Sequence, residues 1–105
     1  MIRFLSSALL FFISGCAPQH FDIRQSGVVT MYLDAPEASH VIFVSSTDSF
    51  REHRIDKDAR GLWVSENLPD RIFRYFYIVD GRVYTPDCRY RERDDFGATN
   101  CIYQP

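Results

Sequence analysis

The stretch Ile72-Phe-Arg-Tyr-Phe-Tyr-Ile-Val79, followed directly by Asp80-Gly81, decides the fold class of this chain. Its aromatic and β-branched residues favour extended backbone, and alternate residues of a strand point to the same side of a sheet. One side of this strand would therefore carry Phe73, Tyr75, Tyr77 and Val79. Asp-Gly is a strong signal for a two-residue hairpin turn, because glycine tolerates the positive φ of a type I′ turn. The stretch predicts a long strand that turns into a second strand at residues 82–84.

Short β-rich runs separated by turn residues continue on both sides of this hairpin. Toward the N-terminus they cover residues 28–33, 40–44, 54–57 and 62–67, and toward the C-terminus residues 100–103. Residues 86–98 are charged and are expected to form a long loop. About seven strands at this spacing, without helical periodicity, predict an all-β, immunoglobulin-like sandwich of two sheets.

The N-terminal end carries an apolar run that is too short to be a membrane span. Residues 4–13 follow Arg3 and end in Ile13-Ser-Gly-Cys16. A helix needs about 20 apolar residues to cross a bilayer, so this run fits the hydrophobic region of an export signal. The segment resembles a bacterial lipoprotein signal peptide with its lipobox, in which the cysteine is lipidated.

This resemblance implies three parts of the chain and a location. Residues 1–15 would be a cleaved signal peptide, residues 16–27 a lipidated N-terminus and tether, and residues 28–105 the folded domain. Acyl chains on Cys16 would anchor the protein in the bacterial cell envelope. Ala17, in place of aspartate, implies the outer rather than the inner membrane if the source is Gram-negative.

Composition and charge narrow the classes of partner. The chain has nine Phe, six Tyr and one Trp, which is too aromatic for a disordered protein. Its formal net charge is −2, and Lys57 is its only lysine. This balance argues against binding to nucleic acid, which needs a basic surface.

Two cysteines remain once Cys16 is lipidated. In an oxidising compartment Cys88 and Cys101 are expected to form a disulfide, which would stabilise the domain by roughly 3 kcal/mol. Two free buried thiols are the alternative.

Several motifs together resemble the early-set immunoglobulin-like domains, and in particular the family 48 carbohydrate-binding module. That family includes the glycogen-binding domain of AMP-activated protein kinase. The resemblance extends over residues 28–104. The motifs that carry it are the opening stretch at residues 29–41, Gly61-Leu-Trp63 with Leu68-Pro69, Arg74-Tyr-Phe-Tyr-Ile-Val-Asp-Gly81, Pro86-Asp87, Asp94-Asp-Phe-Gly97 and Asn100.

The resemblance implies an aromatic core and a place for a ligand. Trp63, Tyr75, Tyr77 and Val79 fall at buried positions of the family. At the family's sugar-binding positions, Phe50 falls on or near the position of the first tryptophan, and Phe76 falls on the position of the lysine. Val83, with Tyr84 beside it, stands near the second tryptophan, and Asn100 keeps its residue type.

Because these sugar-binding positions carry other residue types, three interpretations of this face of the domain follow. Phe50, Phe76, Ile78 and Tyr84 could form an exposed apolar patch that binds a protein, since such patches often mark interfaces. Alternatively, Phe50, Tyr84 and Asn100 could bind a glycan, glycogen-like or of the cell envelope, by stacking and amide hydrogen bonds. The third reading is a purely structural role.

Catalytic and metal-binding signals are weak. The motifs HExxH and GxSxG and a glycine-rich phosphate loop do not occur, and His20, His40 and His53 are scattered. The acidic residues near the C-terminus alternate with arginines, which favours a solvated run of ion pairs over a calcium site. These residues are Glu92, Asp94 and Asp95 with Arg89, Arg91 and Arg93. We therefore expect no catalytic residue, no cofactor and no metal.

Overall fold

A computed structural model describes residues 19–105 of the chain. The predicted signal peptide and Cys16 lie outside these residues. The described part is all-β, with one short 3-10 helix, η1 (Ser46–Asp48). Its strands are β1 (Gln19–Gln25), β2 (Val28–Asp34), β3 (Val41–Ser45), β4 (Glu52–Lys57), β5 (Trp63–Pro69), β6 (Phe73–Val79), β7 (Arg82–Tyr84), β8 (Tyr90–Arg93) and β9 (Thr99–Tyr103).

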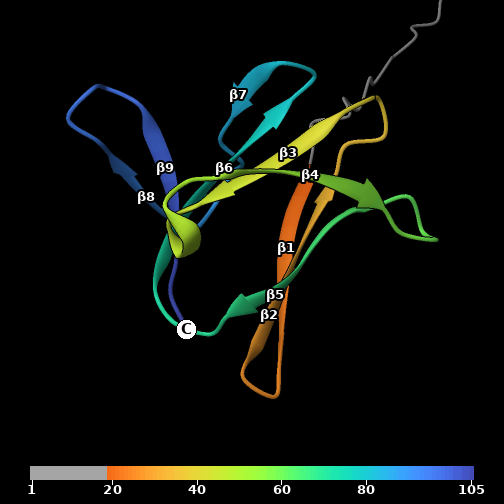
Figure 1. Cartoon of the computed structure of the whole chain (residues 1–105), viewed down its shortest axis with the longest axis horizontal. Helices are drawn as coiled ribbons and strands as arrows, with labels where there is room; N and C mark the ends of the chain where they lie inside the picture. The colour runs from red at the N-terminus through yellow and green to blue at the C-terminus, as the bar shows by residue number, and fades with distance from the viewer. Residues whose placement is uncertain (1–18) are drawn as a thin grey trace, which may run out of the picture.

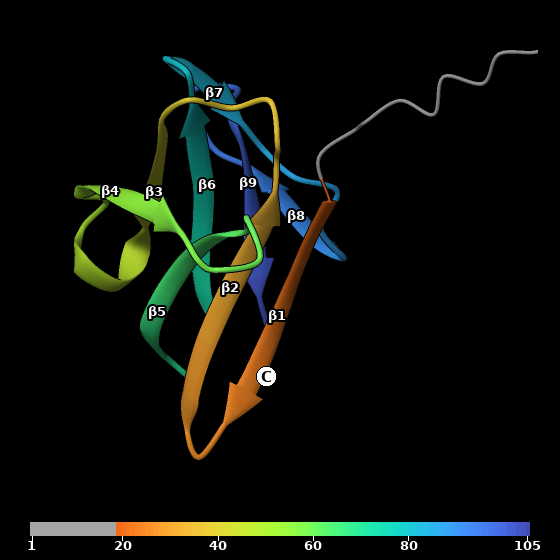
Figure 2. The same ribbon diagram turned by 90° about the vertical axis from the view of Figure 1, so that its right-hand side faces the viewer.

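The strands form one curled antiparallel sheet (Figure 1). Their order is β1-β2-β5-β4-β3-β6-β9-β8. The short strand β7 pairs with the part of β6 that does not pair with β9. Because β4 pairs with both β3 and β5, it joins two halves that pack face to face. In Figure 2, β4 lies at the left, whereas β1 and β8, the two ends of the strand order, lie at the right. This arrangement confirms the predicted fold class and is consistent with a β-sandwich.

The core lies between the two halves and is rich in aromatic rings. The prediction is confirmed for Trp63, Tyr75 and Tyr77, which are buried, whereas Val79 is only partly buried. The indole Nε1 of Trp63 donates a hydrogen bond to the carbonyl oxygen of Ala35 at 3.1 Å. Other large buried side chains include Val29, Met31, Leu33, Val41, Phe43, Val44, Leu68, Phe73, Cys101 and Tyr103.

The hairpin predicted at Asp80-Gly81 is present. Both residues have positive φ, 49° and 83°, as a type I′ turn requires. The Asp80 carboxylate also accepts hydrogen bonds from the backbone N–H groups of His40 and Ser39 at 2.8 and 2.9 Å. These two bonds lower the pKa of Asp80. The turn is thereby tied to the segment that enters β3.

The predicted disulfide joins Cys88 to Cys101. It links the segment before β8 to the centre of β9, and Cys101 lies opposite Tyr75 in the register of β9 with β6. The disulfide therefore fixes the wall formed by β8 and β9 to the aromatic core.

Two predictions about the path of the chain are wrong. Residues 19–25, expected to belong to a tether, form β1, and all seven pair with β2. They look like a tether because the side of β1 that faces inward carries polar residues. Within the expected loop of residues 86–98, Tyr90–Arg93 forms β8 and pairs with β9. Its charged residues suit an edge strand as well as a loop.

Candidate functional site

A row of aliphatic side chains crosses the outer side of the sheet at β3, β6 and β7. Ile42 lies opposite Ile78, and Ile78 lies opposite Val83. Phe76, two residues before Ile78, points to the same side. Val83 is 67% exposed, and the other three are partly buried. We call Ile42, Phe76, Ile78 and Val83 the apolar face.

Tyr84 does not belong to the apolar face. It lies opposite Tyr77, which is fully buried, and packs against the core cluster. The prediction that Tyr84 shares a surface with Phe76 is therefore wrong, because neighbouring residues of a strand point to opposite sides of the sheet. Val83 occupies the place on the outer side that the prediction gave to Tyr84.

Phe50 and Asn100, the other two predicted site residues, lie on different elements and differ strongly in exposure. Phe50 lies in the loop between η1 and β4, where its φ is 63° and its side chain is 42% exposed. Asn100 lies opposite Glu92 on β8 and is only 7% exposed. An amide this deeply covered offers little to a sugar hydroxyl.

Charged residues flank the apolar face. Arg54 on β4 lies opposite Ile42. On the other side, the Arg74 Nε–H donates to both carboxylate oxygens of Glu92, at 2.8 Å each. A partner that covers the apolar face would therefore meet the Arg54 guanidinium at its rim.

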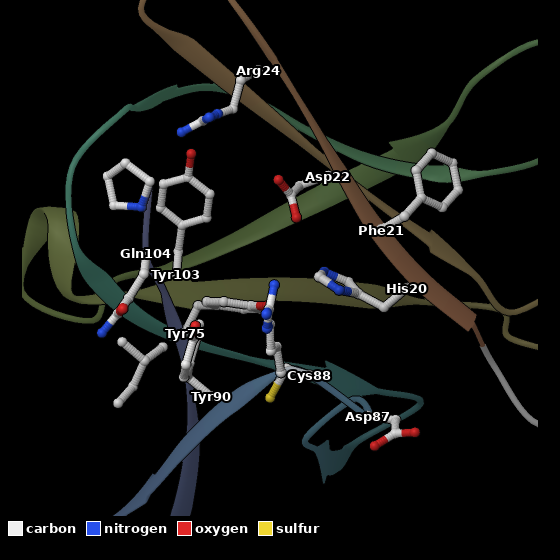
Figure 3. A pocket seen from close by; sticks show the side chains of 13 residues that line it. His20, Phe21, Asp22, Arg24, Tyr75, Asp87, Cys88, Tyr90, Tyr103 and Gln104 are labelled. Atoms are coloured by element: carbon white, nitrogen blue, oxygen red, sulfur yellow. The ribbon is translucent and has the colours of Figure 1, made fainter.

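A second surface feature is a cleft along the open seam between β1 and the β8–β9 wall (Figure 3). Its volume is about 600 Å³. We call it the seam cleft. Residues from β1, β6 and the β8–β9 wall line it, among them His20, Asp22, Arg24, Tyr75, Cys88, Arg89, Tyr90, Ile102 and Tyr103.

His20 is the most deeply placed residue of β1. Its ring stacks on Tyr75 with centroids 5.4 Å apart and meets the edge of Tyr77 at 5.6 Å. The His20 Nε2 and the Tyr77 hydroxyl are buried and lack hydrogen-bond partners among the described residues. Burial lowers the pKa of His20 from 6.5 to about 4. The imidazole is therefore neutral at neutral pH.

The two charged residues that follow on the same side of β1 have different surroundings. The Arg24 Nη1 lies 3.7 Å from the Asp70 Oδ1, and that oxygen also accepts a hydrogen bond from the Tyr103 hydroxyl at 2.7 Å. The pKa of Asp22 is raised, mainly by burial and further by Asp70, although the nearby Arg24 acts in the opposite direction. Arg24 is thus held at one end of the cleft, and Asp22 lies between it and His20.

Our sequence reasoning missed the seam cleft because it treated β1 as a tether. A signal was present: residues 19–25 alternate, with Phe21 and Ile23 on one side and His20, Asp22 and Arg24 on the other. Such period-two alternation is typical of a strand. The β8–β9 wall on the other side of the cleft could not be predicted from the sequence, because it is the curl of the sheet that brings this wall close to β1.

The acidic run near the C-terminus serves the local structure. Glu92 pairs with Arg74. Asp94 Oδ1 accepts hydrogen bonds from the N–H groups of Phe96 and Ala98, both at 2.9 Å, and so shapes the turn between β8 and β9. Over residues 19–105, no group of three or more His, Cys, Asp or Glu side chains could hold a metal ion.

Comparison with known proteins does not place the chain in a family. It matches neither a protein-family model nor a curated protein sequence. Within the part of the chain that the structure describes, no helix has the length and apolar character needed to span a membrane.

Proposed function

We propose that this protein is a lipid-anchored, non-catalytic binding module of the bacterial cell envelope, and that its apolar face docks a partner protein. The observation that carries the proposal is the continuous row from Ile42 through Ile78 to Val83, next to Phe76. Removing apolar surface from water contributes about 25 cal/mol per Å². The row lies on three hydrogen-bonded strands, so little ordering is needed on binding.

The location in the envelope rests on the lipobox-like segment. Residues 17 and 18 separate Cys16 from the start of β1. Even fully extended, so short a connection spans only about 10 Å. A lipid on Cys16 would therefore hold the module close to the bilayer.

Protein binding is better supported than glycan binding at the predicted positions. The glycan reading needs Phe50, Tyr84 and Asn100 to line one exposed site. Tyr84 packs against the core, and Asn100 is nearly buried. The apolar face needs neither residue.

The docking surface can be tested with a photo-cross-linking amino acid placed at Val83 in the full chain, expressed in its source organism. The matched control is Ile72, which is 56% exposed and lies just before β6, outside the apolar face. We expect a discrete protein adduct from position 83 and none from position 72. We also expect Val83→Asp, but not Ile72→Asp, to reduce the co-purified partner by about tenfold or more. Equal adducts at both positions, or an unaffected yield with Val83→Asp, would count against this surface.

The anchor makes a separate prediction. Cys16→Ser should remove the acylation site and move the protein from the detergent phase to the aqueous phase in phase partitioning. Mass spectrometry of the wild-type N-terminus should show an acylated Cys16. Cys88→Ser is the control variant for the partitioning, because it also replaces a cysteine but leaves the acylation site in place. An unacylated wild-type chain that retains residues 1–15 would refute the envelope location without affecting the apolar face.

A further inference from the structure

The seam cleft contains a carboxylate in an unusual position. Asp22 lies opposite Met31, which is fully buried, so its side chain is on the core side of β1. Figure 3 shows the Asp22 carboxylate pointing into the cleft, whereas the ring of the neighbouring Phe21 points away from it. The Asp22 side chain is nevertheless exposed to solvent, so the carboxylate is accessible to a ligand that enters the cleft.

Among residues 19–105 the Asp22 carboxylate forms no ion pair, whereas the other charged groups of the cleft are engaged. Arg24 lies 3.7 Å from Asp70, and Asp87 lies 3.4 Å from Arg91. Arg89 lies over the ring of Tyr90, 5.5 Å from its centroid. Within residues 19–105, Asp22 makes neither a hydrogen bond nor an ion pair of its own. The raised pKa of Asp22 agrees with this, because burial outweighs the attraction of Arg24.

The groups around Asp22 are suited to a cation. Tyr75 lines the same cleft, and burial, with a smaller contribution from the Asp22 charge, raises the pKa of the Tyr75 hydroxyl. His20, the next residue along this side of β1, is neutral and adds no competing positive charge. An ammonium group has three N–H donors for carboxylate and hydroxyl oxygens, and an aromatic face attracts it further.

The size and the walls of the cleft indicate the rest of the ligand. About 600 Å³ accommodates an ammonium with a chain of several carbons. Ile102, Tyr90 and the half-cystine Cys88 provide apolar surface along the opposite wall. A bare metal ion fits poorly, since within the described range no three metal-ligating side chains come together.

We propose that the seam cleft binds a primary alkylammonium group, with the Asp22 carboxylate as its counter-ion and Tyr75 as the aromatic wall beside it. The group could belong to a lysine side chain of a partner or to a free diamine. This site is distinct from the apolar face, and the inference does not depend on the proposed function.

The test is a titration of the isotope-labelled full chain, purified in a neutral maltoside detergent, followed by amide NMR at neutral pH. The probes are n-butylammonium and its uncharged counterpart n-butanol. We expect saturable shifts for residues 20–24 and 87–90 with the ammonium, and none with the alcohol. Nα-acetyl-lysine methylamide and cadaverine are then compared to distinguish a lysine side chain from a diamine.

Two variants make the test specific. Asp22→Asn should weaken n-butylammonium binding by about tenfold or more, because it removes the charged acceptor. Asp87→Asn, in the same cleft, should leave binding within about twofold of wild type, because Asp87 already pairs with Arg91. Absence of saturable shifts in wild type, equal shifts with butanol, or equal weakening by both variants would overturn the proposal. If Asp22→Asn fails to fold, the contrast between n-butylammonium and n-butanol on the wild-type protein still decides whether the cleft binds an ammonium group.

Discussion

Reduction of the Cys88–Cys101 disulfide should lower the free energy of unfolding by about 3 kcal/mol. The two cysteines lie 13 positions apart in the sequence. The cross-link therefore closes a loop of moderate length and excludes the more extended conformations of this segment from the unfolded chain. The loss is large for a domain of this size, whose total stability is small. Urea unfolding of the same protein with and without reductant measures it directly.

The position of the disulfide also predicts where the reduced protein loosens. Only Phe73, Arg74 and Tyr75 of β6 pair with β9, so the β8–β9 hairpin has a short attachment to the rest of the sheet. In the reduced protein, amide hydrogen exchange should accelerate in β8 and β9 before it does in β2 and β5. The double variant Cys88→Ala with Cys101→Ala is the control for effects of the reductant. Unchanged stability in both samples would contradict this role of the disulfide.

Acidification from pH 6.5 to about pH 4 should destabilise the protein through His20 by about 2 to 3 kcal/mol. Burial lowers the pKa of His20 in the folded state to about 4, whereas in the unfolded chain the pKa is near 6.5. Between these values the unfolded chain binds a proton that the folded protein does not bind, so stability falls as the pH falls. Above pH 6.5 both states are neutral at this residue, and the effect vanishes.

His20→Phe isolates this contribution, because a phenyl ring can keep the stacking on Tyr75 but cannot be protonated. We expect wild type to lose stability across this pH range in urea unfolding and the variant to lose about 2 kcal/mol less. His53→Phe is the matched control, since the His53 side chain is 52% exposed and bonded to Asp48 at the surface. Parallel pH profiles for wild type and His20→Phe would show that His20 is not the sensor.

The fold class could be predicted from the sequence because its strongest signals are local. The alternation in β6 and the Asp80-Gly81 turn specify a hairpin without reference to the rest of the chain. β1 and β8 were missed for one reason: each is an end strand of the sheet, and charged side chains are common there. Whether a charged run pairs with a neighbour depends on tertiary structure.

The binding surfaces were predictable only in part. The hairpin turn fixes the register of β7, so a count from Asp80-Gly81 would have put Val83, not Tyr84, opposite Ile78. The burial of Asn100 could not be predicted, because Asn100 pairs with Glu92 of β8, a segment whose charged sequence predicts a loop. The seam cleft lay beyond prediction for a similar reason, since its walls come from segments more than sixty residues apart in the sequence, such as Asp22 and Arg89.

The pairing of β1 has a mechanical consequence for a protein tethered at its N-terminus. All seven residues of β1 pair with β2, and in the proposed anchored protein the chain from Cys16 would enter this strand at Gln19. A partner held on the apolar face would transmit tension to the tether through this ladder. When the pull runs along β1, its hydrogen bonds are loaded together in shear and do not open one after another. The first strand would thus act as a force-bearing clamp between bilayer and cargo.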